Sequence, residues 1–167
     1  LREAASRDAI MLRHGLAQNG RQARDVVRHL ATRLRPGGAV YLVETDVAAL
    51  RFLPYDRHLD EQRSRFLELL MLLGNDLWTG SKLGDSIADA GLELVERDAR
   101  WEVVSLDADV ARALAVRTLP AMRRAGVATE RDCERWQAAW TRFAAEPGDK
   151  IVFTPMFHAI GRRRPMH

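Results

Sequence analysis

A five-residue apolar run at residues 39–43 (AVYLV) follows directly on a Pro-Gly-Gly turn and ends at Glu44. A continuous apolar run of this length is typical of a central parallel strand whose two faces are both covered. The turn, residues 36–38, closes a helical pattern over residues 22–34, in which apolar side chains recur every three or four positions. A helix that leads through a tight turn into a buried strand predicts an α/β fold.

The same alternation continues along the chain. Further apolar runs predict strands at residues 8–12, 92–95 and 151–160. Helical patterns cover residues 59–73, 81–90 and 109–125, and another helix begins at the capping pair Thr129 and Asp132. Pro155 within the last strand predicts a sheet edge or a bulge. The order of elements predicts an α/β sheet that is mostly parallel, with helices on both faces.

Composition limits the class of protein. The 167 residues are 47% hydrophobic and 29% charged, which is typical of a single domain that can bury a core without a disulfide or a metal. The one cysteine, Cys133, cannot form an internal bridge, and this usage favours a reducing compartment. No window is long and apolar enough to span a membrane, and residues 1–13 lack the features of a signal peptide. We therefore expect a cytoplasmic protein.

The net charge of +3 says little about partners. Basic and acidic residues alternate through most of the chain, and only residues 162–164 form a basic run. This pattern is typical of a solvated surface, and no aromatic interleaving or known motif accompanies it. Nucleic acid is therefore a minority interpretation.

No catalytic motif stands alone in the sequence. The glycine-rich nucleotide loops, the zinc-peptidase helix motif and the serine nucleophile elbow are all missing. The five histidines are too scattered to indicate a local metal site, so we expect no metal.

Polar residues do gather at the carboxyl ends of the predicted strands, where ligands bind in open α/β sheets. These residues are Arg13, His14, Glu44, Thr45, Asp46, Asn75, Asp76 and Trp78. Each also has a purely structural interpretation. Arg13 and His14 would cap a strand, and Glu44 and Asp46 would cap the next segment or pair with Arg51. Trp78 would belong to the core, and His158 in the last strand would be a core or rim residue.

Three blocks, at residues 8–20 (DAIMLRHGLAQNG), 34–46 (LRPGGAVYLVETD) and 74–96, carry a family resemblance. In this order, with the last strand at residues 149–163, the chain resembles the C-terminal half of a class I S-adenosylmethionine-dependent methyltransferase. The nearest likeness is to small-molecule methyltransferases of the ubiquinone and menaquinone biosynthesis type. The resemblance implies a Rossmann-like sheet whose last strand runs antiparallel. It also implies one domain over residues 1–167, with helical insertions at residues 47–80 and 104–147 that cover the site.

The resemblance also implies roles for individual residues. The cofactor S-adenosylmethionine would lie against Leu12, Arg13 and His14. Where the acceptor must lose a proton, His14, Glu44 and His158 are the candidate catalytic residues. Asp46, Asn75 and Trp78 would contact a small-molecule acceptor.

The sequence departs from the family at one important point. Family members carry a glycine-rich turn after the first strand and an acidic residue after the second, which hold the cofactor, and this chain contains neither. We therefore expect the N-terminal cofactor-binding strands to be missing from this sequence, and a missing N-terminal segment or a homodimer to complete the site.

Two other functions stay open. In the first, the chain is a degenerate, inactive methyltransferase-like module for interaction or dimerisation, with the face of Trp136, Trp140 and Phe143 as its docking stripe, although such a stripe more often belongs to the core. A weaker alternative is a fragment of another nucleotide-binding α/β enzyme, such as a dehydrogenase.

Overall fold

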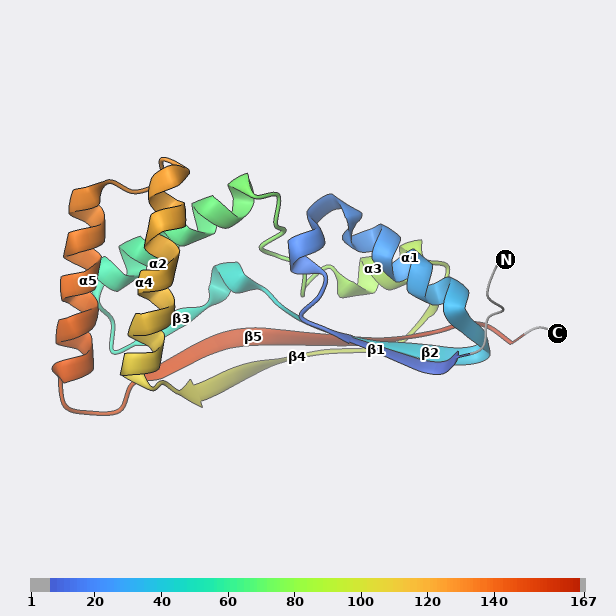
Figure 1. Cartoon of the computed structure of the whole chain (residues 1–167). Coiled ribbons are helices and arrows are strands. Elements are labelled where there is room, and N and C mark those ends of the chain that lie inside the picture. Colours follow the sequence, from blue (N-terminus) through green and yellow to red (C-terminus); the bar gives the residue numbers. More distant parts are fainter. Residues whose placement is uncertain (1–6, 166–167) are drawn as a thin grey trace. The chain divides into compact units, whose positions relative to one another are not determined.

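The computed structural model describes residues 7–165 (Figure 1). The elements are β1 (Arg7–Arg13), η1 (Ala17–Gln22), α1 (Ala23–Arg33), β2 (Leu34–Thr45), η2 (Val47–Ala49), β3 (Arg51–Leu53), α2 (Arg57–Leu72), α3 (Leu83–Asp89), β4 (Glu93–Ser105), α4 (Ala108–Arg124), α5 (Glu130–Ala145) and β5 (Ile151–Arg162). They form two compact units. The sheet unit holds residues 7–48, 74–101 and 155–165, and the helical unit holds residues 49–73 and 102–154.

The sheet of the sheet unit is mixed. Strand β2 pairs in parallel with β1 and antiparallel with β5, and β4 pairs with β5. Tyr41 in the middle of β2 lies between Met11 of β1 and Ile160 of β5. The α/β class and the antiparallel last strand are therefore confirmed. The expectation of a mostly parallel sheet is not met. Strand β5 lies between β2 and β4 and runs antiparallel to β2, and of the pairings with a described register, β1 with β2 is parallel.

Pro155 does not mark a sheet edge, since β5 has partners on both sides. Residues from Met156 to Arg162 pair with β2, and residues from Ile151 to Phe153 pair with β3 in the helical unit. Pro155 lies between these two stretches. A residue without a backbone N–H is tolerated there because the ladder changes partner at that point.

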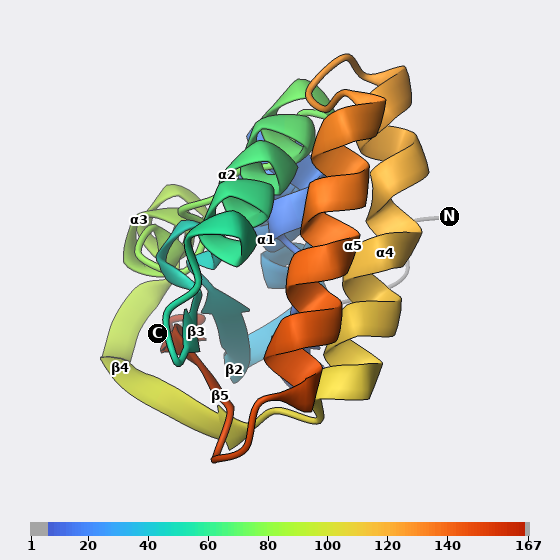
Figure 2. The same ribbon diagram turned by 90° about the vertical axis from the view of Figure 1, so that its left-hand side faces the viewer.

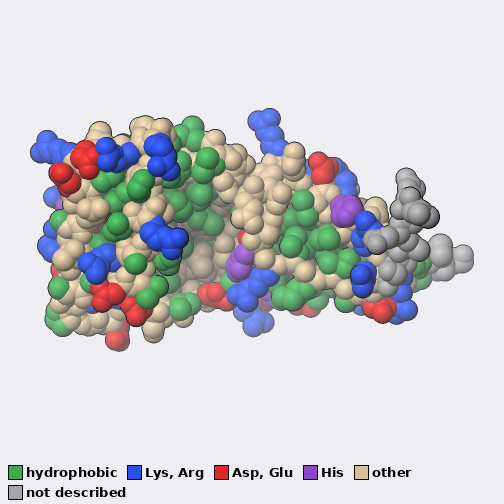
Figure 3. All heavy atoms as spheres, viewed as in Figure 1, with side chains coloured by type: hydrophobic (Ala, Val, Ile, Leu, Met, Phe, Trp, Pro, Cys, Tyr) green, Lys and Arg blue, Asp and Glu red, His purple; other side chains and the backbone are tan. Residues whose placement is uncertain are grey.

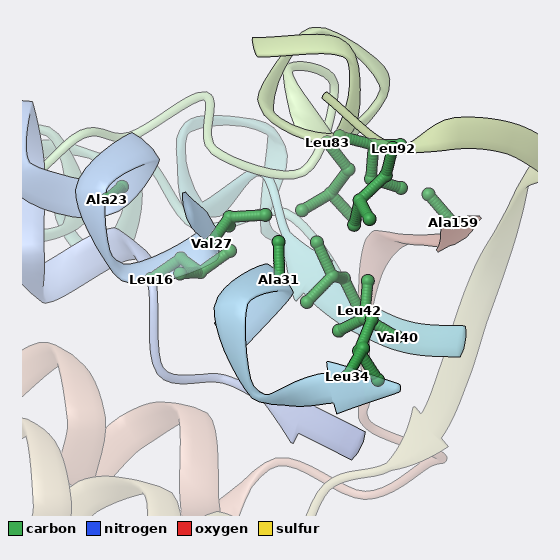
Figure 4. Close-up of a cluster of buried hydrophobic side chains, with 11 residues drawn as sticks. Leu16, Ala23, Val27, Ala31, Leu34, Val40, Leu42, Leu83, Leu92 and Ala159 are labelled. Atoms are coloured by element: carbon green, nitrogen blue, oxygen red, sulfur yellow. The ribbon is translucent and has the colours of Figure 1, made fainter. Parts of the chain in front are cut away.

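Helices α1 and α3 lie on the same face of the sheet (Figure 1). Their buried side chains meet those of the strands in one cluster, shown in Figure 4: Leu16, Ala23, Val27, Ala31, Leu34, Val40, Leu42, Leu83, Ile87, Leu92 and Ala159. The alternation of side chains along a strand sends Tyr41 and Met11 to the opposite face. Met11 is 62% exposed there. Within the described part of the sheet unit, the expectation of helices on both faces is therefore wrong.

The helical unit packs α5 against α2 and α4 (Figure 2). Its helices begin where the sequence places capping residues. Thr129 and Asp132 form the expected capping box at α5, and Asp56 and Asp107 cap α2 and α4. Helix α4 continues through Pro120, as expected.

The aromatic side chains of α5 form the core of the helical unit. Trp136, Trp140 and Phe143 are each almost fully buried. Trp140 donates its indole N–H to Gln62 Oε1 at 2.8 Å, so its one polar atom is also satisfied. The helical spacing of these residues therefore reflects packing inside the unit, and the docking stripe considered for the alternative function is not exposed.

The strands differ from the prediction in three ways. Strand β2 begins at Leu34, so the predicted turn at residues 36–38 lies within the strand, where the register with β1 shifts. Strand β4 runs from Glu93 to Ser105, well beyond the predicted residues 92–95, and the three-residue β3 was not predicted. The helical unit overlaps the two segments expected as insertions. Among the described residues, no helix is long and apolar enough to cross a membrane.

Candidate functional site

Two loops border the carboxyl ends of β1 and β2 in the sheet unit. The first loop, residues 14–20, follows β1 and includes the first residues of the 3-10 helix η1, and the second loop, residues 74–82, precedes α3. Because β1 and β2 are parallel, their carboxyl ends meet at the same edge of the sheet, where ligands bind in α/β folds.

Glu44 lies at the end of β2 and is only 2% exposed. Its Oε2 accepts the backbone N–H of Leu16 at 2.8 Å, and its Oε1 lies 3.6 Å from His14 Nδ1. A buried carboxylate is costly unless it is hydrogen-bonded, so these contacts explain how Glu44 is accommodated. The structure therefore brings two of the three catalytic candidates side by side.

His14 has a backbone conformation that is uncommon for a residue other than glycine. Its φ is 52°, in the left-handed region, while its N–H still donates to the carbonyl of Val43 at 3.0 Å. The side chain is 41% exposed. Backbone held in this region clusters at functional sites, where the surrounding structure sustains the cost.

Asp46 is also 2% exposed and faces the second loop. Its Oδ1 accepts the backbone N–H of Ser81 at 3.0 Å. The neighbouring Gly80 lies so close to the sheet that an added Cβ would meet Phe157 Cδ2 at 2.5 Å. Asp46 thus binds the second loop, although the sequence analysis placed it against the acceptor.

An ion pair closes the second loop. Asp76 accepts Lys82 Nζ at 2.7 Å and the backbone N–H of Trp78 at 3.0 Å. Burial opposes ionisation of Asp76, but these two hydrogen bonds outweigh it and hold the pKa of the carboxyl below its usual value. Trp78 is 51% exposed and is therefore no core residue. Asn75, in the same loop, is half-buried.

The other cofactor-side candidates point in different directions. Leu12 packs against the hydrophobic cluster beneath α1. Arg13 is exposed and, by strand alternation, lies on the open face of the sheet. Of residues 12–14, His14 is the one that pairs with Glu44.

His158 lies apart from His14 and Glu44. Its side chain points from β5 to the face of the sheet that no helix of the sheet unit covers. A hollow of about 500 Å³ lies there, lined by Tyr41, Glu96, Arg100, His158 and Ile160. His158 Nε2 is 3.6 Å from Glu96 and 3.9 Å from Asp98, both on β4. These contacts join two strands, and the structure does not bring His158 to the Glu44 carboxylate, which faces the helices.

On the face of the molecule seen in Figure 3, basic and acidic side chains are interspersed, and neither forms a large patch of one charge. In the part of the chain that the structure describes, no group of His, Cys, Asp and Glu side chains is arranged to hold a metal ion.

Several residues of this region were not singled out from the sequence. Gly20, Gly74 and Ser81 shape the two loops through contacts of their backbone atoms. Such contacts do not depend on a recognisable pattern of residue types, so the sequence does not reveal them. Tyr41 and Arg100 line the hollow near His158, but they belong to strands whose pairing the sequence does not reveal. The sharp turn at Gly74 was visible only as the end of a helical pattern.

No family model and no curated protein matches the sequence. Solved structures do match. A protein of Bacillus halodurans named as a candidate methyltransferase aligns over 98% of this chain and 68% of its own, with 10% identity and a TM-score of 0.53. The [4+2]-cyclase SpnF aligns over 99% of this chain and 53% of its own, with 19% identity and a TM-score of 0.43. Phosphoethanolamine N-methyltransferase 2 of Haemonchus contortus, solved with phosphomonomethylethanolamine and S-adenosylhomocysteine, aligns over 98% and 34%, with 12% identity and a TM-score of 0.42.

The first of these matches shows that the chain has the fold of class I methyltransferases. The expected resemblance is thus confirmed at the level of the fold. The chain spans 68%, 53% and 34% of the three neighbours, so each of them has segments without a counterpart here.

Proposed function

We propose that the chain carries the acceptor-facing, C-terminal part of an S-adenosylmethionine-dependent methyltransferase that acts on a small molecule. The observation that carries this proposal is the His14–Glu44 pair at the carboxyl ends of two parallel strands, in the fold of class I methyltransferases. The ubiquinone-type subfamily is part of the proposal, as is action in the cytoplasm.

The residues present fit the cofactor in part. When bound, S-adenosylmethionine supplies an electrophilic methyl group. His14 is half-exposed beside the strand ends, where a ligand would lie. Glu44 and Asp46 are buried and engaged with backbone N–H groups, so neither is open to hold ribose hydroxyls. We propose that the remaining cofactor contacts come from polypeptide outside the 167 residues or from a second copy of the chain. The exposed face of the sheet around Met11 supports this proposal.

His14 has the surroundings of a general base. Nδ1 is the ring nitrogen that lies within 4.0 Å of Glu44, which leaves Nε2 to meet an acceptor. A carboxylate beside Nδ1 orients the ring and stabilises the imidazolium that forms when Nε2 takes a proton. The proposed acceptor therefore has a proton to lose, as a hydroxyl group does. Catalysis then consists of alignment, exclusion of water and this proton transfer.

In the complete enzyme, the His14→Ala variant should lower kcat by about 10²- to 10⁴-fold, because a positioned general base contributes on that order. Steady-state kinetics with the natural acceptor would measure this. The matched control is His29→Ala, an exposed histidine on α1. Unchanged turnover in the His14 variant would remove the residue from the reaction.

The alternative of an inactive interaction module still has the absence of the family's cofactor-binding motifs as its support, but the aromatic face of α5 is buried and offers no docking stripe. Calorimetric titration tests the enzyme against both alternatives. We expect the chain to bind S-adenosylhomocysteine and not to bind NAD. Binding of NAD would favour a dehydrogenase fragment. A well-folded chain that binds neither ligand would be an incomplete methyltransferase or the inactive module.

A further inference from the structure

We propose that the two loops bordering the site, residues 14–20 and 74–82, are held as one unit by the buried carboxylates of Glu44 and Asp46, so that a ligand ordering one loop also orders the other. Glu44 and Asp46 are then positioning residues. The identity of that ligand rests on the proposed function, but the connection between the loops does not.

The two carboxylates lie close together in the sequence. Glu44 is the last residue but one of β2, and Asp46 is the first residue after the strand. Each accepts one backbone N–H, and the two donors come from different loops: Leu16 in the first and Ser81 in the second. Both carboxylates are almost fully buried, and neither loop can leave without exposing an unpaired buried charge.

The loops also contact each other directly. The backbone N–H of Asp76 donates to the carbonyl of Ala17 at 3.0 Å. Gly20 approaches Gly74 so closely that an added Cβ would lie 1.9 Å from the Gly74 carbonyl oxygen. With a φ of 49°, Gly20 also occupies backbone space that other residues avoid. The connection therefore needs glycine at this position for two reasons.

This arrangement couples the two sides of the site. The first loop carries His14, and the second carries Trp78 and Asn75, which the sequence analysis placed against the acceptor. If binding at one loop is favoured by order in the other, then each ligand must raise the affinity for the other by the same factor. The cofactor side would thus prepare the acceptor side before the acceptor arrives.

Hydrogen exchange measured by mass spectrometry tests the proposal on the chain itself. Gly20→Ala should raise exchange roughly three- to tenfold in peptides from both loops, because it separates them. Gly37→Ala is the matched control: Gly37 also has a positive φ, of 80°, but an added Cβ would meet nothing within 4 Å. Faster exchange confined to residues 14–20 would overturn the proposal.

A second pair of variants covers the case in which Gly20→Ala does not fold. Asp46→Ala should loosen both loops, and Asp46→Asn, which keeps an oxygen for the Ser81 N–H, should restore most of the protection. Equal effects of the two substitutions would overturn the role given to Asp46.

Exchange with S-adenosylhomocysteine present separates this proposal from the proposed function. Protection of both loops supports the coupling, and protection of the first loop alone overturns it. If no region is protected, the proposed function fails, while the response of both loops to Gly20→Ala still decides whether they form one unit.

Discussion

At the scale of single residues, buried or paired carboxylates shape both units. In the sheet unit, Glu44 and Asp46 accept backbone N–H groups from two loops. In the helical unit, Asp132 accepts the N–H and the hydroxyl of Thr129 and pairs with Arg135. In each case an acidic side chain accepts a backbone N–H that no helix or strand ladder satisfies.

Asp132 makes a prediction about pH. Hydrogen bonds from the hydroxyl and the N–H of Thr129 lower its pKa to about 2. Since an unfolded aspartate has a pKa of about 3.9, the ionised side chain stabilises the fold above pH ~4 and loses that effect as the pH falls toward 2. Asp132→Ala should cost about 1 kcal/mol of unfolding free energy at pH 7, with a smaller difference at pH 2. Urea unfolding at both pH values measures this.

The control for Asp132 is Glu134→Ala, an exposed position on the same helix, which should change stability by less than about 0.5 kcal/mol. A difference between wild type and Asp132→Ala that does not narrow in acid would contradict the capping role.

At the scale of elements, the sequence predicts most helices and strands but not how they are covered. The helical patterns at residues 59–73 and 109–125 and the capping pair at Thr129 correspond to α2, α4 and α5. The three-residue β3 has too few residues to show a period. An apolar run such as residues 39–43 indicates that both faces of a strand suit burial, but it does not say what covers them.

The candidate site shows a similar division. The rule that ligands bind at the carboxyl ends of strands placed His14 and Glu44 in the same region of the sheet. It could not show that Glu44 and Asp46 face inward, because the side of a strand that meets the helices depends on tertiary packing. The family resemblance added His158 to the catalytic candidates, although that side chain lies on the opposite face of the sheet, beside Glu96.

Helix α5 offers a test of the core of the helical unit. Trp140→Ala should lower the free energy of unfolding by about 3–5 kcal/mol, since it empties a buried site and leaves Gln62 without its indole partner. Leu114→Ala on α4 is the control, because Leu114 is largely exposed and should cost within about 0.5 kcal/mol. Chemical denaturation measures the free energy of unfolding of both variants. If Trp140→Ala lowers it only slightly, the side chain is not part of the core and α5 would again be a candidate docking surface.

At the scale of the whole molecule, the chain has two separate sets of core residues. The cluster around Val27 and Leu42 lies within the sheet unit, and the clusters around Trp140 and Trp136 lie within the helical unit. Units with their own cores open with their own free energies. Residues that bind ligand and residues that build the helical core are therefore expected to respond to mutation separately.

Native-state hydrogen exchange tests that separation. Val27→Ala should speed exchange in the strands and helices of the sheet unit and leave α4 and α5 unchanged, because it removes methyl groups from the sheet unit's cluster alone. Trp136→Ala should have the opposite pattern. If either variant loosens both units equally, the chain behaves as one cooperative body.

In the proposed function, a methyl donor binds at the carboxyl ends of β1 and β2. The most direct test is a nuclear magnetic resonance titration of the chain with S-adenosylhomocysteine, which locates even weak binding. We expect saturable shifts of backbone amides in residues 12–16, 44–46 and 74–82, and weaker binding by His14→Ala. Shifts that never saturate, or that map to the hollow around Tyr41 and His158, would contradict the account.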